Sequence, residues 1–241
     1  GLYSQYLNQL FESTHLTLGL RYDRFSGIGA QLSPRLGLVQ TLSEHHNLKL
    51  LYGESFRAPT ESELNLVNNT DILGNPDLKP ETVQSWELIW VAQWTKTALS
   101  LGYFENHFKD AIAKISTGVS TSTGDPVKYE NTSQDPIKGF EFELSHELNE
   151  QWLLRTTLTH INEKPEESFR EASQLASFMV NYQQGRWNAN LISYFHSRRK
   201  MATGGINNER LNLHSYWQLI GKLNYQLTPG WQAFIQAKNI S

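Results

Sequence analysis

The sequence contains no cysteine, so it can form neither a disulfide framework nor a thiolate metal site. It also has no apolar run approaching the ~18–20 residues of a membrane helix; Leu-Ile-Trp-Val-Ala at 88–92 is among the longest. Residues 1–10 lack the basic start and apolar stretch of a secretory signal peptide. If the chain meets a membrane, it therefore does so with strands.

Charged residues are few, at 19%, and the formal net charge of -3 gives no reason to expect a nucleic-acid partner. Aromatic residues are abundant, at 12%, yet the mean hydropathy of -0.49 is that of a polar protein. A high content of aromatic residues without an equally high content of Leu, Ile and Val is typical of a protein surface at a water–lipid boundary. A soluble β-rich domain that stacks its Trp and Tyr on a ligand is the alternative.

The dominant pattern is a period of two. Residues 14–23, 139–146 and 211–227 alternate apolar and polar side chains, so each segment would form a strand with one apolar and one polar face. The same rule predicts about a dozen strands. They lie near 2–10, 14–23, 35–42, 47–57, 81–94, 97–115, 137–148, 151–161, 173–184, 186–196, 211–227 and 231–240.

The links between these strands alternate in length. Short links at 43–46, 149–150, 184–185 and 228–230 alternate with long ones near 24–34, 58–80, 116–136, 162–172 and 197–210. Long and short connections then fall at opposite ends of an antiparallel sheet, as in outer-membrane barrels with tight periplasmic turns and long extracellular loops. The fold class predicted is all-β, an antiparallel transmembrane β-barrel.

The two faces of the predicted strands suit different media. The apolar face carries Trp86, Trp90, Trp94, Trp152, Trp187, Trp217 and Trp231, and the polar face carries Arg21, Lys49, Glu87, Glu141, Glu143, Arg155, Lys222 and Lys238. Unpaired charges would be unfavourable in a dry core but are tolerated along a watery lumen. A soluble fold would need a second apolar layer to cover the other face.

The most specific motif lies within residues 52–88. A strand ends in Ser-Phe-Arg-Ala-Pro-Thr, and the turn sequence Gly-Asn-Pro-Asp-Leu-Lys-Pro-Glu-Thr leads into the next strand. The motif residues are Ser55, Phe56, Arg57, Ala58, Pro59, Asn75, Pro76, Leu78, Pro80 and Glu81. This combination closely resembles the barrel of TonB-dependent outer-membrane receptors. Shorter stretches also resemble this family and occur in the expected order: 19–23, 33–38, 102–112, 137–143 and 237–241.

The resemblance implies a barrel of about 22 strands filled by an N-terminal plug domain. Residues 1–241 would then be one barrel domain truncated at both ends, without the plug, the energy-coupling peptide or the last strand. Such receptors lie in the outer membrane of Gram-negative bacteria, against lipid and lipopolysaccharide. They import a scarce nutrient, most commonly a ferric siderophore and less often haem, cobalamin or a glycan, with energy from the TonB complex.

Candidate ligand contacts are cations and aromatic residues in the long links: Arg57, Tyr129, Phe169, Arg170, Arg198, Arg199, Lys200 and Arg210. Cations beside rings suit an anionic, ring-bearing chelate. The basic run at 198–200 would equally suit lipopolysaccharide phosphates or a solvated loop. Haem receptors typically carry a histidine between the two motif boxes, and residues 61–74 have none. The scattered histidines predict no metal site, and no cofactor is expected.

Two other classes remain open at this stage. A soluble carbohydrate-binding β-sandwich would use its Trp and Tyr for sugar stacking. An enzyme in a β-barrel is disfavoured, because the sequence has no nucleophile elbow, no zinc-protease helix motif and no phosphate-binding loop.

The alternation makes a direct prediction about neighbouring residues. A spin label at position 219, in place of Leu219, should report lipid, and one at position 218, in place of Gln218, should report water, because the two side chains point to opposite faces of a strand. Electron paramagnetic resonance with oxygen and nickel relaxation agents distinguishes the two media. Finding both labels in the same medium would defeat the barrel assignment.

Overall fold

The computed structural model describes residues 1–25, 28–67, 69–119, 124–166, 170–202 and 210–239. It is almost entirely β-sheet, and none of its described helices is long and apolar enough to cross a membrane. The elements are β1 (Leu2–Phe11), β2 (Thr14–Phe25), β3 (Gly29–Ser43), β4 (His46–Arg57), α1 (Glu61–Asn65), β5 (Ile72–Leu73), β6 (Glu81–Trp94), β7 (Thr97–Lys109), β8 (Ala111–Ser116), β9 (Val127–Thr132), β10 (Ile137–Glu147), β11 (Trp152–Glu163), β12 (Gln174–Gln184), β13 (Trp187–His196), β14 (Arg199–Ala202), β15 (Arg210–Leu213), β16 (Tyr216–Thr228) and β17 (Trp231–Lys238).

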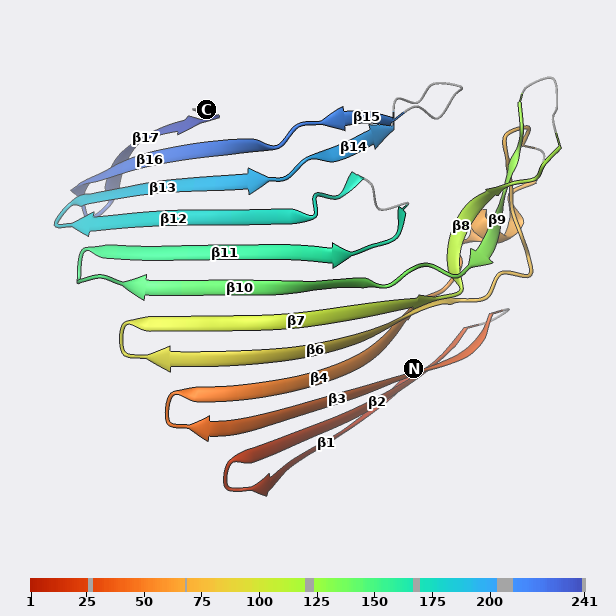
Figure 1. Cartoon of the computed structure of the whole chain (residues 1–241), viewed down its shortest axis with the longest axis horizontal. Coiled ribbons are helices and arrows are strands. Elements are labelled where there is room, and N and C mark those ends of the chain that lie inside the picture. The colour runs from red at the N-terminus through yellow and green to blue at the C-terminus, as the bar shows by residue number, and fades with distance from the viewer. Residues whose placement is uncertain (26–27, 68, 120–123, 167–169, 203–209, 240–241) are drawn as a thin grey trace. The chain divides into compact units, whose positions relative to one another are not determined.

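Twelve of these strands form one sheet in the order β1-β2-β3-β4-β6-β7-β10-β11-β12-β13-β16-β17 (Figure 1). Each of its strands therefore lies beside the strand that precedes it in the main sheet, and the pairs with a defined register are antiparallel. Each predicted strand overlaps a strand of the main sheet, including the one at 2–10, whose residues are all exposed. Two smaller sheets, β14-β15 and β5-β9-β8, arise from the long links.

Two predicted strands were too long. The segment 97–115 is two strands, because Asp110 has a φ of 52°, a left-handed conformation that ends β7 before β8 begins. The segment 211–227 is also two strands, since β15 pairs with β14 in a separate hairpin and only β16 joins the main sheet. The alternation is irregular beside both breaks, at 105–109 and at 215–216, but these irregularities were interpreted as part of one strand.

The predicted long link at 24–34 was also wrong in extent. Strand β2 continues to Phe25 and β3 begins at Gly29, whose φ of 103° is one that glycine adopts without a steric penalty. The glycines and Pro34 made this segment look like a loop, yet Pro34 lies within β3. The other connections alternate between short and long as predicted, with the longest between β4 and β6 and between β7 and β10.

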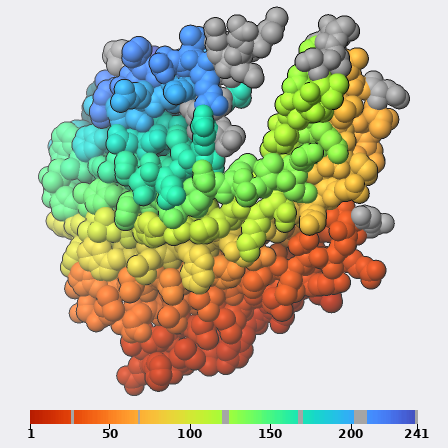
Figure 2. Space-filling model, turned by 45° about the vertical axis from the view of Figure 1, so that its right-hand side comes forward, coloured from red at the N-terminus to blue at the C-terminus, as the bar shows by residue number. Residues whose placement is uncertain are grey.

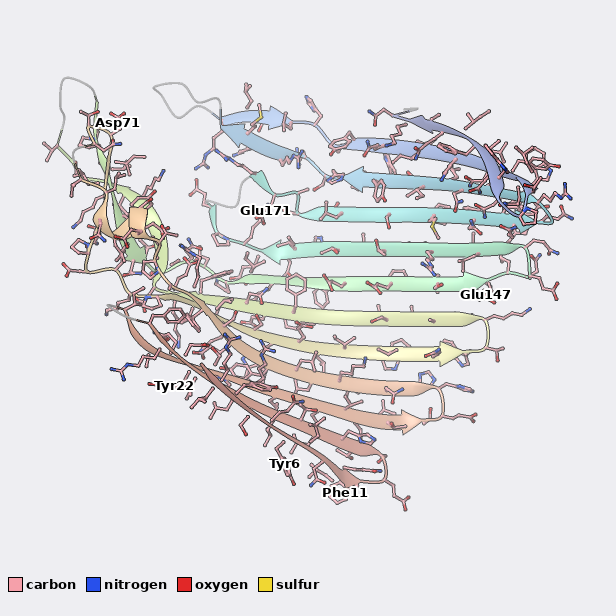
Figure 3. All side chains as sticks on the ribbon, turned by 180° about the vertical axis from the view of Figure 1, so that it is seen from behind. Tyr6, Phe11, Tyr22, Asp71, Glu147 and Glu171 are labelled. Carbon is pink, nitrogen blue, oxygen red and sulfur yellow. The ribbon has the colours of Figure 1, made fainter. Side chains whose placement is uncertain are left out.

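The residues group into two compact units. Unit 1 comprises residues 1–39, 50–87 and 105–136, and unit 2 comprises residues 40–49, 88–104 and 137–241. In unit 2 the turns β10–β11, β12–β13 and β16–β17 lie at one end of the strands, and the long connections β11–β12 and β13–β16 leave from the other. Figure 3 shows Glu147 at the end with short turns and Glu171 at the end with long connections.

The registers in unit 2 confirm the division into two faces. Phe142 faces Leu158 across β10 and β11, while the adjacent Glu143 faces Thr157 on the other side of the sheet. In the same way Leu223 pairs with Ala189, and the adjacent Asn224 pairs with Asn188. Apolar and polar side chains therefore separate by strand parity.

The described part of the chain has almost no core. Its buried apolar residues are Leu78, Ala92, Ala111 and Ala172, and no large side chain in it is fully buried. The exposed tryptophans are Trp86, Trp94, Trp152, Trp187, Trp217 and Trp231. A β-sandwich would cover one face of each sheet with the other sheet, so this single layer does not support the soluble sugar-binding alternative.

The family motif folds a compact module within unit 1, formed by residues 57–67, 69–81, 110–119 and 124–132 and here called the motif module. Residue Ile72 of β5 pairs in parallel with Val127 of β9, and β9 pairs with β8 along its whole length. In Figure 2 the yellow-green β8–β9 hairpin lies against the orange segment that contains α1 and β5. The described parts of the links 58–80 and 116–136 thus share a small sheet.

Gly74 lies where two backbone segments of the motif module approach each other closely. Its N–H donates to the carbonyl of Leu66 at 2.8 Å. A Cβ added at this position would lie 2.5 Å from the backbone nitrogen of Leu66 and 2.9 Å from the carbonyl oxygen of Leu64. Backbone atoms cannot move aside as a flexible side chain can, so this position requires glycine.

The G74A variant should therefore loosen the motif module, by about 1–3 kcal/mol from the overlap of Cβ with backbone. Trypsin should then cleave the purified receptor faster after Lys128, which pairs with Leu73 beside Gly74, as measured by mass spectrometry. The matched control is G230A, because a Cβ at Gly230 would meet open space. Equal cleavage rates for the two variants would contradict this account of the module.

Candidate functional site

The predicted ligand contacts fall into two loop clusters, one in each unit. Arg57 and Tyr129 belong to the motif module of unit 1, whereas Arg198, Arg199, Lys200 and Arg210 line a pocket in unit 2. Phe169 lies outside the described residues. Arg170 is described and is exposed.

Arg57, the last residue of β4, holds two carboxylates at once. Its Nε donates to Glu81 Oε1 at 2.6 Å and its Nη1 donates to Glu63 Oε2 at 2.9 Å, and Nη2 reaches the second oxygen of each carboxylate at 3.2 Å. The backbone N–H of Ile112 also donates to Glu81 at 3.1 Å. The guanidinium makes two hydrogen bonds to each carboxylate and therefore joins β4, α1 and β6.

A capping box begins α1 and completes this network. The Thr60 side chain accepts from the Glu63 N–H, and the Thr60 N–H donates to Glu63 Oε2 at 2.7 Å. Partial burial raises the pKa of the Glu63 carboxyl, but hydrogen bonds from Arg57 and Thr60 outweigh it and leave the pKa below its ordinary value. The carboxylate of Glu63 is thus held ionised by its partners.

The second motif box is fixed by two asparagines. The Asn75 side chain donates to the carbonyl of Tyr129 at 2.9 Å, and its oxygen accepts from the Asp77 N–H at 3.1 Å. The Asn131 side chain accepts from the Lys79 N–H at 2.8 Å and donates to the Lys79 carbonyl at 2.9 Å. These bonds tie the turn to β9, so the most recognisable residues of the sequence stabilise a loop.

Tyr129 presents its ring to a cation of the neighbouring strand. Lys114 of β8 is its register partner, and the ammonium lies 5.5 Å from the ring centroid. This is within the range of a cation–π contact. The ring of Tyr129 thus lies beside a cation, Lys114, that is not among the predicted ligand contacts.

The second cluster is a cavity of about 340 Å³ between the β11–β12 connection and the β14–β15 hairpin, here called the basic pocket. It is lined by Lys164, Pro165, Glu166, Glu171, Arg198, Arg199, Lys200, Arg210 and Asn212. Four of the eight predicted contacts therefore meet in one place. Among the described residues, no carboxylate pairs with Arg198, Arg199 or Lys200.

Local structure explains how these side chains converge. Lys200 and Asn212 are direct partners in the β14–β15 hairpin, and Arg210 lies on the same face because it is two residues from Asn212. On the opposite wall, Lys164 donates its ammonium to the carbonyl of Glu171, which closes the β11–β12 connection on itself. Figure 3 shows this connection at the end of β11.

One ion pair bridges the two walls of the basic pocket. Arg210 Nη1 donates to Glu166 Oε1 at 3.0 Å, between residues 44 positions apart in the sequence. The sequence analysis missed Lys164, Glu166, Glu171 and Asn212, since no spacing rule connects the two links. Arg170 does not belong to the described lining of the pocket. Within the described residues, no group of three or more His, Asp or Glu could hold a metal ion.

The Arg57 network makes the motif module sensitive to acid. Because the native pKa of Glu63 is lowered, its contribution to stability is complete above the ordinary glutamate pKa of about 4.3 and is lost as the pH falls through the native value. Tryptic cleavage cannot be followed at that pH, so pepsin cleavage at Leu64–Leu66 is measured from pH 5 downward. The rate should rise steeply in the native receptor and less steeply in E63Q. The control E61Q removes a charge from the same helix and should keep the native dependence of the cleavage rate on pH. If E63Q also kept the native dependence, the Arg57 network would not determine the acid sensitivity of the motif module.

Comparison with known proteins agrees with this architecture. The family described as TonB dependent receptor-like, beta-barrel matches residues 1–240. The chain is 30% identical over 160 residues to the probable TonB-dependent siderophore receptor PirA of Acinetobacter baumannii, covering 54% of this chain and 21% of that protein. The crystal structure of PirA superposes with a TM-score of 0.84 at 21% identity, over 99% of this chain and 41% of that one.

Two further relatives have different names. The iron-regulated outer membrane virulence protein of Vibrio cholerae is 28% identical over 240 residues, covering 91% of this chain and 37% of that protein. The vitamin B12 transporter BtuB of Vibrio vulnificus is 25% identical over 218 residues, covering 87% of this chain and 32% of the transporter. The chain thus spans well under half the length of these relatives. Because the family matches nearly every residue, the chain belongs to the β-barrel of the TonB-dependent outer-membrane receptors.

Proposed function

We propose that the receptor containing this chain imports an anionic ferric siderophore through the outer membrane. The observation that carries the proposal is the basic pocket, in which five cationic side chains meet two carboxylates. Lysine and arginine side chains bind anionic oxygens by charge-assisted hydrogen bonds. The names of the PirA and Vibrio cholerae relatives, which refer to siderophores and iron, support the same ligand class.

The excess of positive charge favours catecholate chelates within that class. Each catechol loses both hydroxyl protons when it binds iron(III), so a complex with several catechols is a polyanion with flat ring faces. Guanidinium groups such as those of Arg198 and Arg199 suit both features, because they are planar and can stack on rings as well as pair with anions. A neutral chelate would leave this charge uncompensated.

Cobalamin is the second candidate, because the BtuB relative matches most of the chain. The corrin ligand carries far less negative charge than a catecholate complex, and the excess of cations in the basic pocket therefore favours the chelate. Competition between the two ligands for the purified receptor would distinguish them.

The remaining parts of the proposal follow from the family. The chain forms part of one barrel domain, whose apolar face meets lipid and lipopolysaccharide and whose polar face meets a plug domain. The TonB complex supplies the energy through that plug. The proposal contains no chemical step on the ligand, and no nucleic acid takes part.

Removing two cations of the basic pocket should weaken ligand binding. In R198A/K200A each lost charge-assisted hydrogen bond is worth roughly 1.5–3 kcal/mol, so the Kd for a ferric tris-catecholate should rise at least tenfold. Quenching of receptor tryptophan fluorescence measures the Kd, and iron uptake by cells lacking other receptors measures transport. The control K79A removes an exposed lysine of the motif module. Unchanged affinity in R198A/K200A, or preference for cobalamin, would contradict the proposal.

A further inference from the structure

Four rings meet in unit 2 beside the β3–β4 turn and are here called the His–Trp cluster: His45, His46, Trp90 and Trp94. The ring of His46 stacks on Trp90, with centroids 5.5 Å apart and planes 9° apart, and makes a T-shaped contact with Trp94 at 5.4 Å. The ring of His45 lies 6.3 Å from that of Trp94, and the His45 carbonyl accepts from the Gln93 N–H at 2.8 Å. The turn is therefore fixed to the end of β6.

The His–Trp cluster lies on the lipid face, at the end with the short turns. Trp90 and Trp94 have the same strand parity as Leu88, so they belong to the apolar face of β6. The Glu147 N–H donates to the Lys96 carbonyl at 2.8 Å, which places the β6–β7 turn beside the β10–β11 turn (Figure 1). Short turns of outer-membrane barrels are periplasmic, and their aromatic residues lie at the level of the lipid headgroups. The periplasmic leaflet of an outer membrane consists of phospholipid.

The two imidazoles have hydrogen-bonding groups that the protein leaves unused. In the part of the chain that the structure describes, the rings of His45 and His46 make neither a hydrogen bond nor an ion pair, and both residues are half-buried. Neutral imidazole carries one N–H and imidazolium carries two, so each ring can donate in either state. The exposed charges of the adjoining turns, Glu44 and Lys96, have opposite signs. Recognition of a lipid here would thus depend on N–H donors to its phosphate and not on net charge.

An apolar hollow adjoins the His–Trp cluster. It has a volume of about 380 Å³, lies within unit 2 and shares Trp90 with the cluster. On β4, Leu48 is the next residue of the same parity after His46, so the hollow continues the cluster along the strand. Its other apolar lining residues include Leu88, Leu101, Phe142 and Leu158. Polar donors at one end and an apolar hollow at the other match a molecule with a phosphate head and an acyl chain.

We propose that the His–Trp cluster and the adjoining hollow form a binding site for one phospholipid of the periplasmic leaflet. The imidazoles of His45 and His46 donate to its phosphate, and one of its acyl chains fills the hollow. The inference goes beyond the proposed function, because it concerns the outer wall of the barrel and holds whichever nutrient the receptor imports.

Two lipids test the site in the full receptor, purified in detergent and freed of bound lipid. One is a phosphatidylglycerol, and the other is the diacylglycerol with the same acyl chains, which lacks the phosphate. Native mass spectrometry gives the Kd of the first bound lipid, and the native receptor should bind the phospholipid more tightly.

The double variant H45F/H46F isolates the hydrogen bonds to phosphate. Phenylalanine keeps a ring against Trp90 and Trp94 but removes the N–H donors. The Kd for the phospholipid should therefore rise about fivefold, while the Kd for the diacylglycerol should change little. The matched control is H214F, because His214 is exposed in the β15–β16 connection at the other end of the strands, and it should keep both native Kd values.

The variant L158W isolates the hollow. Leu158 is 43% exposed, so a larger ring at this position can fill the hollow without being forced into a packed core. The Kd should rise for the phospholipid and the diacylglycerol by the same factor, because both lose the same acyl-chain contact.

Three results would overturn the inference. Equal affinity of the native receptor for the two lipids would show that the phosphate is not recognised. An unchanged Kd for the phospholipid in H45F/H46F would show that water alone satisfies the imidazoles. An unchanged Kd for both lipids in L158W would show that the hollow holds no acyl chain.

Discussion

Every part of this chain depends on an antiparallel sheet that is one layer thick and whose two faces meet different media. In the strands the backbone hydrogen bonds are satisfied by neighbours, so the side chains are sorted only by parity. The described residues include almost no buried apolar side chains, and six of the tryptophans are exposed. Water alone would leave the apolar face of such a sheet uncovered. Hydrocarbon on the apolar face and water on the polar face give each face a suitable medium.

The same constraint determines where function can reside. Strands fixed by register leave little room for a binding site, so the candidate ligand contacts lie in or next to the long connections. In unit 1 the connection is stabilised by the Arg57 network and by Asn75 and Asn131, which makes it a rigid scaffold. In unit 2 the connections bring lysines and arginines together around a cavity. The motif residues Arg57 and Asn75 stabilise a loop, whereas the residues that line the basic pocket belong to no motif.

This division explains what could be predicted from the sequence. Period-two alternation predicted the strands because parity is a local property. The breaks at Asp110 and between β15 and β16 were missed because the short irregularities in the pattern beside them were interpreted as part of one strand. The helix α1 had a readable signal, Thr60 followed by Glu63, in a segment that was interpreted only as loop. The pairing of Glu166 with Arg210 had no signal, since it depends on how two distant connections converge in space. Cation-rich links indicated the basic pocket but not its carboxylates.

The central claim is that the tryptophan-bearing face of the sheet meets hydrocarbon. The most direct measurement is the fluorescence of Trp187 and Trp217 in the reconstituted receptor, taken as the difference from variants with phenylalanine at these positions. Bromine on lipid acyl chains quenches only rings that touch the bilayer. The account predicts strong quenching by brominated phospholipid and little quenching by an aqueous quencher such as iodide. The opposite pattern, with iodide reaching both rings and brominated lipid reaching neither, would contradict it.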